Sequence, residues 1–242
     1  VPSSGWKIEK VSDRKVRDEW KPLWGKRAVV EDHFNELVID LVNPAGQPER
    51  MQLVVRGYND VFAFCYKIPD GEGPRVNVQS ELTAYNFAGD YTAWFYNGEN
   101  HNIGPEKLTE TDGTRLPVMT VKAGDKHYMA IHEACLETGA PLVLQSKGGE
   151  SLFSVASKPT SLSPGYTSAW RVVLYGTTPG VLTDSHLLEL LNPDPDSRYD
   201  FSWVKPGLAV WDWRINGAVW DGFTYGMSYP SWVRMVDFAA EQ

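Results

Sequence analysis

Short β-type runs separated by turns fill most of this 242-residue chain, and their succession limits the fold more than any other feature. Apolar and polar side chains alternate over residues 36–42 and again over 51–55, which is the pattern of half-buried strands. Turn-forming residues at 43–48 separate these two runs and predict a hairpin. Many short strands at such spacing predict a mainly β fold, a large antiparallel β-sandwich. The further β-type runs lie at residues 61–68, 75–87, 90–96, 116–122, 126–136, 141–145, 152–156 and 169–175.

The pattern changes near residue 200. Residues 184–191 have the apolar face of a short helix that closes the sandwich. Beyond a polar linker, residues 207–213 predict a strand, 215–225 a glycine-rich loop, and 230–241 an amphipathic helix with Pro230 in its first turn.

Strand, loop and helix together make half of a βαβ unit. Such a strand needs a parallel partner, and its helix needs a sheet to cover. We therefore predict a β-sandwich domain over residues 1–200. Residues 201–242 should form a linker and the first β/α unit of a (β/α)8 barrel that is truncated in this chain.

Charge and hydropathy argue against two classes of partner. The net charge is -8 and basic residues form no long run, so we expect neither nucleic acid nor an anionic membrane surface as partner. No apolar run approaches the roughly 18 to 20 residues that a membrane span requires.

The two cysteines, Cys65 and Cys135, each lie in apolar, strand-like sequence. Their spacing does not resemble a metal-binding or redox pair. We expect buried free thiols, with a disulfide as the alternative.

Glu133 is the candidate metal ligand. In an uninterrupted strand over residues 126–136, its side chain shares a face with Met129, Ile131 and Cys135, while His132 faces the other way and is expected to pack structurally. An ionised carboxylate among apolar neighbours costs several kcal/mol unless it is paired or metal-bound. Calcium, which prefers oxygen ligands, is a suitable partner. The alternatives are an ion pair with an arginine such as Arg171, or a bulge that turns Glu133 toward solvent.

A series of motifs in one order resembles glycoside hydrolase family 97. In that family the last motif of the series marks the passage from an N-terminal β-sandwich into a (β/α)8 barrel. Two positions depart from the family pattern, Val61 where glycine is usual and Cys65 where arginine is usual. The motifs are Trp20-Lys21-Pro22-Leu23-Trp24-Gly25, His33-Phe34-Asn35-Glu36-Leu37, Arg56-Gly57-Tyr58-Asn59-Asp60 with Ala63-Phe64-Cys65-Tyr66, Ile131-His132-Glu133-Ala134, Trp170-Arg171, Asp184-Ser185, and Ser202-Trp203-Val204-Lys205-Pro206-Gly207 before Trp211-Asp212-Trp213.

The resemblance implies a secreted or periplasmic, exo-acting α-glycosidase of α-glucosidase or α-galactosidase type, which depends on calcium and acts on α-linked oligosaccharides. It also implies that Glu133 is the carboxylate sent from the sandwich to the calcium ion. The barrel supplies the other ligands and the catalytic carboxylates. We therefore expect no catalytic residue in this chain, no activity from it alone, and the remainder of the barrel as its partner, from the same gene or a second chain.

Trp211, Asp212 and Trp213 end the predicted first barrel strand. In (β/α)8 enzymes that end of a strand faces the active site, so we predict that these residues bind substrate through indole stacking and a carboxylate on sugar hydroxyls. The alternative is that the two indoles pack at the domain interface.

Two other functions are compatible with the sequence. The 10 Trp, 11 Tyr and 9 Phe are compatible with a free-standing carbohydrate-binding sandwich. The other function is purely structural: the sandwich supports the barrel, and Glu133 is inert.

Overall fold

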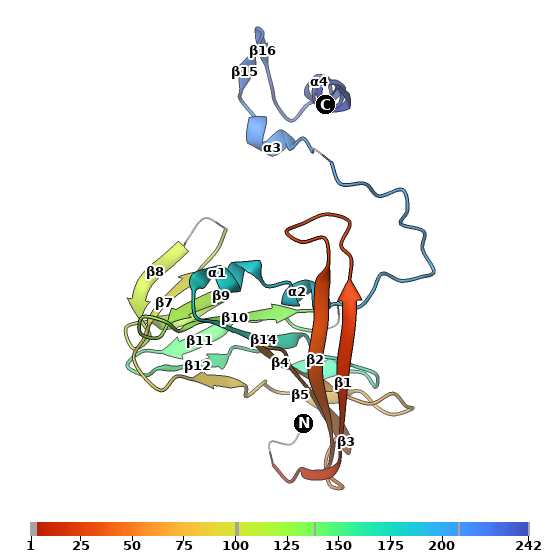
Figure 1. The fold of residues 1–242 in the computed structure, drawn as a ribbon, viewed down its shortest axis with the longest axis vertical. Coiled ribbons are helices and arrows are strands. Elements are labelled where there is room, and N and C mark those ends of the chain that lie inside the picture. The colour runs from red at the N-terminus through yellow and green to blue at the C-terminus, as the bar shows by residue number, and fades with distance from the viewer. Residues whose placement is uncertain (1–3, 100–101, 138, 208, 242) are drawn as a thin grey trace. The chain divides into compact units, whose positions relative to one another are not determined.

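The structure is a computed structural model, and it describes residues 4–99, 102–137, 139–207 and 209–241 (Figure 1). The chain divides into two compact units. The first comprises Val1–Pro22 and Lys26–Asp194, and the second comprises Leu23–Gly25 and Pro195–Gln242.

One antiparallel sheet dominates the first unit. Its strands run in the order β1-β2-β3-β4-β14-β10-β9-β11-β12-β6, and β7 pairs with both β8 and β9. Two further strands, β5 and β13, pair with each other. The bounds are β1 Lys7–Trp20, β2 Val30–Val42, β3 Arg50–Gly57, β4 Val61–Lys67, β5 Val76–Val78, β6 Ala84–Asn86, β7 Thr92–Tyr96, β8 Asn102–Lys107, β9 Asp112–Lys122, β10 Tyr128–Ala134, β11 Leu144–Lys147, β12 Leu152–Val155, β13 Thr160–Leu162 and β14 Trp170–Gly176.

Strand β9 joins the two halves of the sheet. Its residues 112–115 pair with β11, whereas its residues 119–122 pair with β10. Side chains of β7, β9 and β10 therefore meet side chains of β11 and β12 in one core cluster, which includes Phe95, Met119, Ile131, Leu144 and Phe153. The predicted large antiparallel β architecture is confirmed.

A second core cluster lies on the opposite face of β10. Ala130 and Ala134 alternate with Ile131 along this strand and pack with Cys65 and Trp170. Two short helices, α1 (Pro179–Asp184) and α2 (Leu187–Leu190), follow β14. Leu187 of α2 belongs to this cluster, so α2 covers this face of the sheet.

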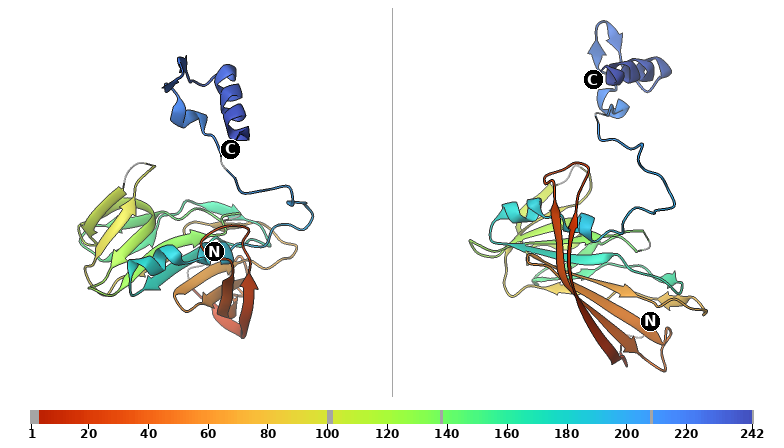
Figure 2. Two further views of the ribbon diagram at one scale, coloured as in Figure 1. Left: turned by 45° about the horizontal axis from the view of Figure 1, so that its top comes forward. Right: turned by 45° about the vertical axis from the view of Figure 1, so that its right-hand side comes forward.

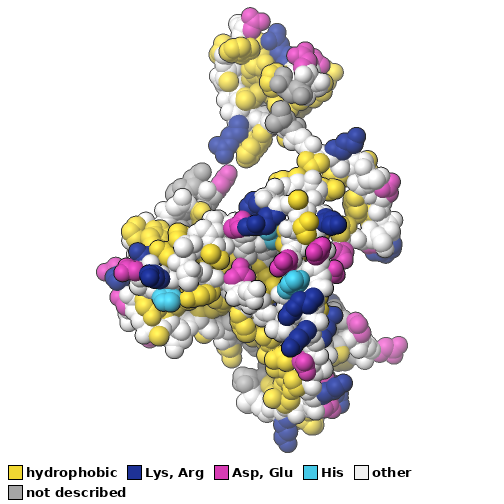
Figure 3. All heavy atoms as spheres, in the orientation of Figure 1, with side chains coloured by type: hydrophobic (Ala, Val, Ile, Leu, Met, Phe, Trp, Pro, Cys, Tyr) yellow, Lys and Arg dark blue, Asp and Glu magenta, His cyan; other side chains and the backbone are white. Residues whose placement is uncertain are grey.

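The hairpin predicted between residues 36–42 and 51–55 is present as β2 and β3, which pair from Asn35 opposite Gly57 to Val42 opposite Arg50 (Figure 2). The sequence did not predict β1, which pairs with β2 over its whole length. Most β1 side chains are exposed, and charged side chains gather along this edge of the sheet (Figure 3). Charged side chains are a common protection of an exposed sheet edge.

Two predicted elements of the first unit are wrong in detail. The strand at residues 75–87 is divided into β5 and β6, and the segment between them brings Glu81 to the buried Arg171. The helix predicted at 184–191 is shorter than expected: α2 covers only Leu187–Leu190, because Asp184 ends α1 and Ser185 has an extended backbone, with φ -63° and ψ 138°. Helix α1 was not predicted.

The second unit contains α3 (Asp212–Ile215), the hairpin β15 (Val219–Trp220) and β16 (Phe223–Thr224), and α4 (Tyr229–Ala240). Helix α4 confirms the amphipathic helix predicted at residues 230–241, and Met235 is its buried apolar side chain. The loop predicted at 215–225 holds a hairpin whose turn residues Asp221 and Gly222 have φ of 49° and 69°. Positive φ at both positions is typical of a tight hairpin turn.

The strand predicted at residues 207–213 is wrong. Residues 207 and 209–211 have no regular structure, Leu208 lies outside the described residues, and Asp212–Ile215 is helical. A parallel strand needs a neighbouring strand for its backbone hydrogen bonds, and the described part of this chain pairs none with residues 207–213. No helix in the described ranges is both long and apolar enough to cross a membrane.

Candidate functional site

Glu133 lies near the end of β10, directly opposite Arg171 of β14. The residue is 9% exposed. Its Oε2 atom accepts a hydrogen bond from the backbone N–H of Leu142 and lies 3.5 Å from Nη1 of Arg171. The sequence left three environments open for this carboxylate, and the structure shows the ion pair with Arg171.

Arg171 also binds a second carboxylate. Its Nε donates to Oε1 of Glu81 over 2.9 Å, and its Nη2 donates to Oε2 over 2.6 Å. This geometry is bidentate, the arrangement in which guanidinium and carboxylate interact most strongly. A single buried guanidinium therefore faces two carboxylates, one from β10 and one from the segment between β5 and β6.

Burial and the neighbouring charges shift the pKa values of both Glu133 and Arg171. Burial raises the pKa of Glu133, and Glu81 acts in the same direction, whereas the Leu142 N–H and the Arg171 charge oppose the rise. Burial alone would lower the pKa of Arg171, but the hydrogen bonds and charge of Glu81 outweigh it, so this pKa is raised. Arg171 therefore stays protonated, and its positive charge is balanced by the carboxylates of Glu81 and Glu133.

The residues around Glu133 do not make a calcium site by themselves. Calcium takes about six to eight oxygen ligands. Within the described parts of the chain, no group of three or more His, Cys, Asp or Glu side chains is placed to hold a metal ion. A cationic guanidinium also stands 3.5 Å from the carboxylate oxygen where a cation would bind.

The sequence neighbours His132 and Cys135 do not share the Glu133 face of β10. His132 is partly buried and lies on the other face of β10, and burial lowers the pKa of its imidazole. Cys135 does not share the Glu133 face, because β10 ends at Ala134 and Cys135 has a φ of 55°. It packs against the cluster that contains Cys65, and both cysteines are free thiols. Burial raises the pKa of Cys65 to about 11.

The three predicted substrate-binding residues lie at the start of α3, not at the end of a strand. Trp211 and Trp213 are 55% and 67% exposed, and the Arg214 guanidinium lies 4.9 Å from the Trp211 ring centroid. Asp212 is the N-terminal residue of α3, and its Oδ2 accepts a hydrogen bond of 3.0 Å from Nε1 of Trp232 in α4. Asp212 therefore joins the two helices of the second unit.

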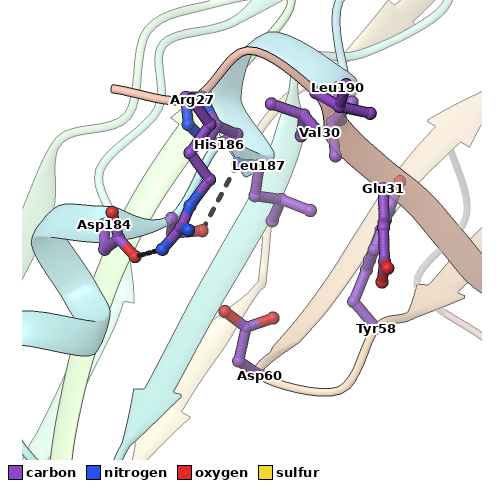
Figure 4. A pocket seen from close by; sticks show the side chains of 11 residues that line it. Arg27, Val30, Glu31, Tyr58, Asp60, Asp184, His186, Leu187 and Leu190 are labelled. Atoms are coloured by element: carbon purple, nitrogen blue, oxygen red, sulfur yellow. Dashed lines mark hydrogen bonds and ion pairs between the residues drawn. The ribbon is translucent and has the colours of Figure 1, made fainter. Parts of the chain in front are cut away.

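A cavity of about 360 Å³ lies elsewhere in the first unit, between the start of β2, the β3–β4 turn and the α1–α2 junction (Figure 4). Arg27 forms an ion pair with Asp184 on one side, and the Asp60 carboxylate lies across from them. The remaining lining residues are Val29, Val30, Glu31, Tyr58, Ser185, His186, Leu187 and Leu190.

The sequence interpretation missed Glu81, Leu142 and this cavity. Glu81 lay inside a predicted strand, and a backbone N–H such as that of Leu142 leaves no trace in a side-chain pattern. Asp60 and Asp184 did stand in two of the motifs that resemble family 97, which was the available signal for the cavity.

The family model described as "Glycosyl-hydrolase 97 N-terminal" matches residues 2–193. The chain therefore belongs to this glycoside hydrolase family, as the ordered motifs indicated.

Two curated relatives are similar over almost the whole chain. A "Retaining alpha-galactosidase" of Bacteroides thetaiotaomicron is 26% identical over 95% of this chain and 40% of its own length. A "Probable retaining alpha-galactosidase" of Streptomyces bingchenggensis is 26% identical over 99% of this chain and 37% of its own length. The chain thus spans about two fifths of these relatives.

Solved structures of family 97 enzymes are also similar to this chain over almost its whole length. A glycoside hydrolase family 97 enzyme from Pseudoalteromonas sp. strain K8, in complex with acarbose, superposes with a TM-score of 0.80 at 26% identity. The similarity covers 99% of this chain and 38% of that one. An E480Q form of that enzyme, in complex with panose, has the same values. A β-arabinopyranosidase with a TM-score of 0.75 at 18% identity shares the fold.

Proposed function

We propose that this chain is the N-terminal part of an exo-acting, retaining α-glycosidase that hydrolyses terminal α-linked galactose or glucose from oligosaccharides. The observation that carries the proposal is the 0.80 TM-score over 99% of the chain with family 97 enzymes that bind oligosaccharides. The names of the two curated relatives favour an α-galactosidase with retention of configuration.

In this proposal the bond-breaking groups lie outside the chain. A retaining glycosidase uses two carboxyl groups about 5 to 5.5 Å apart, one as acid and base and the other as nucleophile. The buried carboxylate of Glu133 and the partly buried carboxylate of Glu81 are both paired with Arg171, so neither is poised for that chemistry. The partner of this chain is the remainder of a (β/α)8 barrel, and the chain alone is inactive.

We propose calcium binding only for a longer protein that includes this chain. Glu133 would supply one carboxylate, and about five or more oxygens would come from residues outside this chain. Bound calcium would supply positive charge that orders its oxygen ligands. Because the residues described here do not form that site alone, we assign no reaction step to the ion.

Trp211, Asp212 and Trp213 are the proposed sugar contacts of the second unit. The two exposed indoles can stack on a sugar ring, as aromatic faces do in carbohydrate sites, whereas Asp212 already accepts a hydrogen bond from Trp232. We therefore expect Trp211 and Trp213 to contribute more to substrate affinity than Asp212. The family resemblance also supports a periplasmic or secreted location.

The test is the stereochemistry of hydrolysis by a polypeptide that extends this chain to the length of its curated relatives. Aryl α-galactoside and α-glucoside are the substrates, and NMR identifies the anomer of the sugar that is released first. We expect the α-anomer, because double displacement retains configuration. Release of the β-anomer, or hydrolysis of β-glycosides alone, contradicts the proposal.

A further inference from the structure

The guanidinium of Arg171 uses its nitrogens unequally for its two carboxylate partners. Nε and Nη2 donate hydrogen bonds to Glu81, over 2.9 Å and 2.6 Å. Nη1 lies 3.5 Å from Oε2 of Glu133, and it is buried without a hydrogen-bond partner among the described residues. Glu81 therefore supplies the directed hydrogen bonds of this cluster, whereas Glu133 makes a charge contact beyond normal hydrogen-bonding distance.

The segment that carries Glu81 is itself tied to the sheet. The Glu81 backbone N–H donates to Oγ of Ser157 over 2.6 Å. Two residues further on, the backbone carbonyl of Thr83 accepts a hydrogen bond of 2.9 Å from the N–H of Val155 in β12. Because a guanidinium is planar and rigid, two bonds to a tethered carboxylate also fix the direction of its third nitrogen. Glu81 thus determines where Nη1 stands relative to Glu133.

Glu133 is held by fewer hydrogen bonds. Among the described residues, the Leu142 N–H is the one group that donates a hydrogen bond to its carboxylate. An ionised carboxylate has about four acceptor sites, so Glu133 has capacity that the described residues do not use. Without Glu133, Arg171 would remain paired with Glu81. Without Glu81, the buried guanidinium would have no directed hydrogen bond to a carboxylate, so the two carboxylates are not equivalent.

We propose that Glu81 is a positioning residue for Glu133. It keeps the Arg171 guanidinium paired within the fold, so that the Glu133 carboxylate is held by Nη1 and Leu142 and retains acceptor sites for a further partner. This inference rests on the proposed function, in which the sandwich presents Glu133 to a cation that the rest of the enzyme helps to bind. Glu133 is then the carboxylate that changes partner, and Glu81 is the one that stays with Arg171.

The first test uses residues 1–242 and compares Glu81→Gln with Glu133→Gln by urea unfolding. Glu81→Gln should raise the equilibrium constant for unfolding about 100-fold, because a buried guanidinium loses its charged partner. Glu133→Gln should raise it less than about tenfold, since its amide oxygen can still accept from Leu142 and Glu81 still pairs with Arg171. Glu150→Gln is the matched control, because Glu150 is an exposed carboxylate outside the cluster.

NMR of the Arg171 Nε–H group reports the orientation of the guanidinium in the folded protein. In the unmodified chain and in Glu133→Gln, this proton should exchange slowly with water, because it is bonded to Glu81. In Glu81→Gln its signal should shift, and its exchange should become at least about tenfold faster.

The second test uses the polypeptide extended to the length of the curated relatives and measures calcium affinity by titration calorimetry. Glu133→Gln should weaken binding about 100-fold, and Glu81→Gln about tenfold, because residues that orient a metal ligand contribute to affinity without touching the ion. Glu81→Asp keeps the charge and should recover part of the loss. Circular dichroism checks that each variant is folded.

The proposal is overturned if Glu133→Gln destabilises residues 1–242 as much as Glu81→Gln does. It is also overturned if folded, extended Glu81→Gln binds calcium as tightly as the unmodified protein. If the unmodified extended polypeptide binds no calcium and cleaves no α-glycoside, the proposed function fails. The comparison of the two variants in residues 1–242 then decides the positioning role by itself.

Discussion

Glu133 of β10 and Arg171 of β14 stand opposite each other in the antiparallel register, with 3.5 Å between Oε2 and Nη1. The same guanidinium holds Glu81 in a bidentate pair. The carboxylate that the sequence singled out as a metal ligand thus has its counter-charge within the chain. This arrangement explains how the first unit can bury Glu133 without a bound cation.

Replacing Arg171 by methionine should destabilise the first unit by about 3 to 5 kcal/mol, because two carboxylates would lose a buried partner. Urea unfolding followed by tryptophan fluorescence measures the change. Arg50→Met removes an exposed pair with Glu9 and serves as the control, with little expected effect. Equal stability of the two variants would show that the Arg171 cluster is not the stabilising feature we describe.

Glu36 should make stability depend on pH on the acid side. Burial alone would raise the pKa of Glu36, but hydrogen bonds from Arg14 and Arg56 outweigh it and hold this pKa below its usual value of 4.5. A lowered folded-state pKa means that the stabilisation is complete above pH 4.5 and is lost as pH falls through the folded-state pKa.

Glu36→Gln should therefore reduce the free energy of unfolding at pH 7 by about 2 kcal/mol and flatten its fall toward acid pH. Urea titrations at a series of pH values give both quantities. Glu9→Gln, at a more exposed pair, should keep the slope of the unmodified chain. A Glu36→Gln variant with an unchanged acid slope would contradict this account.

Gly139 permits a close approach of two backbones next to the Glu133 cluster. A Cβ atom at this position would lie 2.1 Å from the backbone nitrogen of Ala169. Gly139→Ala should therefore cost about 1 to 3 kcal/mol, because the two segments must separate. Gly57→Ala is the control, since no atom lies within 4 Å of its added Cβ. The prediction is wrong if thermal unfolding gives Gly139→Ala and Gly57→Ala the same unfolding temperature.

Calcium should not change the stability of this chain. One carboxylate paired with Arg171 is too small a ligand set, so chelator and millimolar calcium should give the same unfolding temperature. Differential scanning calorimetry makes the comparison, with magnesium as the control ion. A rise with calcium that Glu133→Gln abolishes would mean that the chain itself carries a calcium site.

Periodicity predicted the positions of β2 and β3, but not which face of β2 is buried, because Glu36 is buried and Leu37 is 42% exposed. In β3 only Val54 is fully buried. Periodicity failed for β1, where both faces are largely exposed and charged residues hide the alternation. It also failed at residues 207–213, because a strand pattern forms a strand only when another strand pairs with it.

For the candidate site, the sequence could identify Glu133 and name Arg171 as its alternative partner. It could not choose between calcium and arginine, since that choice depends on the register of β10 with β14. The Asp221-Gly222 hairpin is different, because its signal was present in the sequence and the loop prediction overlooked it.

The account depends most on the statement that the bond-breaking carboxylates lie outside this chain. Its most direct test is the rate at which purified residues 1–242 hydrolyse an aryl α-galactoside and an aryl α-glucoside, with and without calcium. The retaining α-galactosidase of Bacteroides thetaiotaomicron serves as the positive control. We predict no hydrolysis above the uncatalysed background, and an enzyme-like rate from the chain alone would contradict the account.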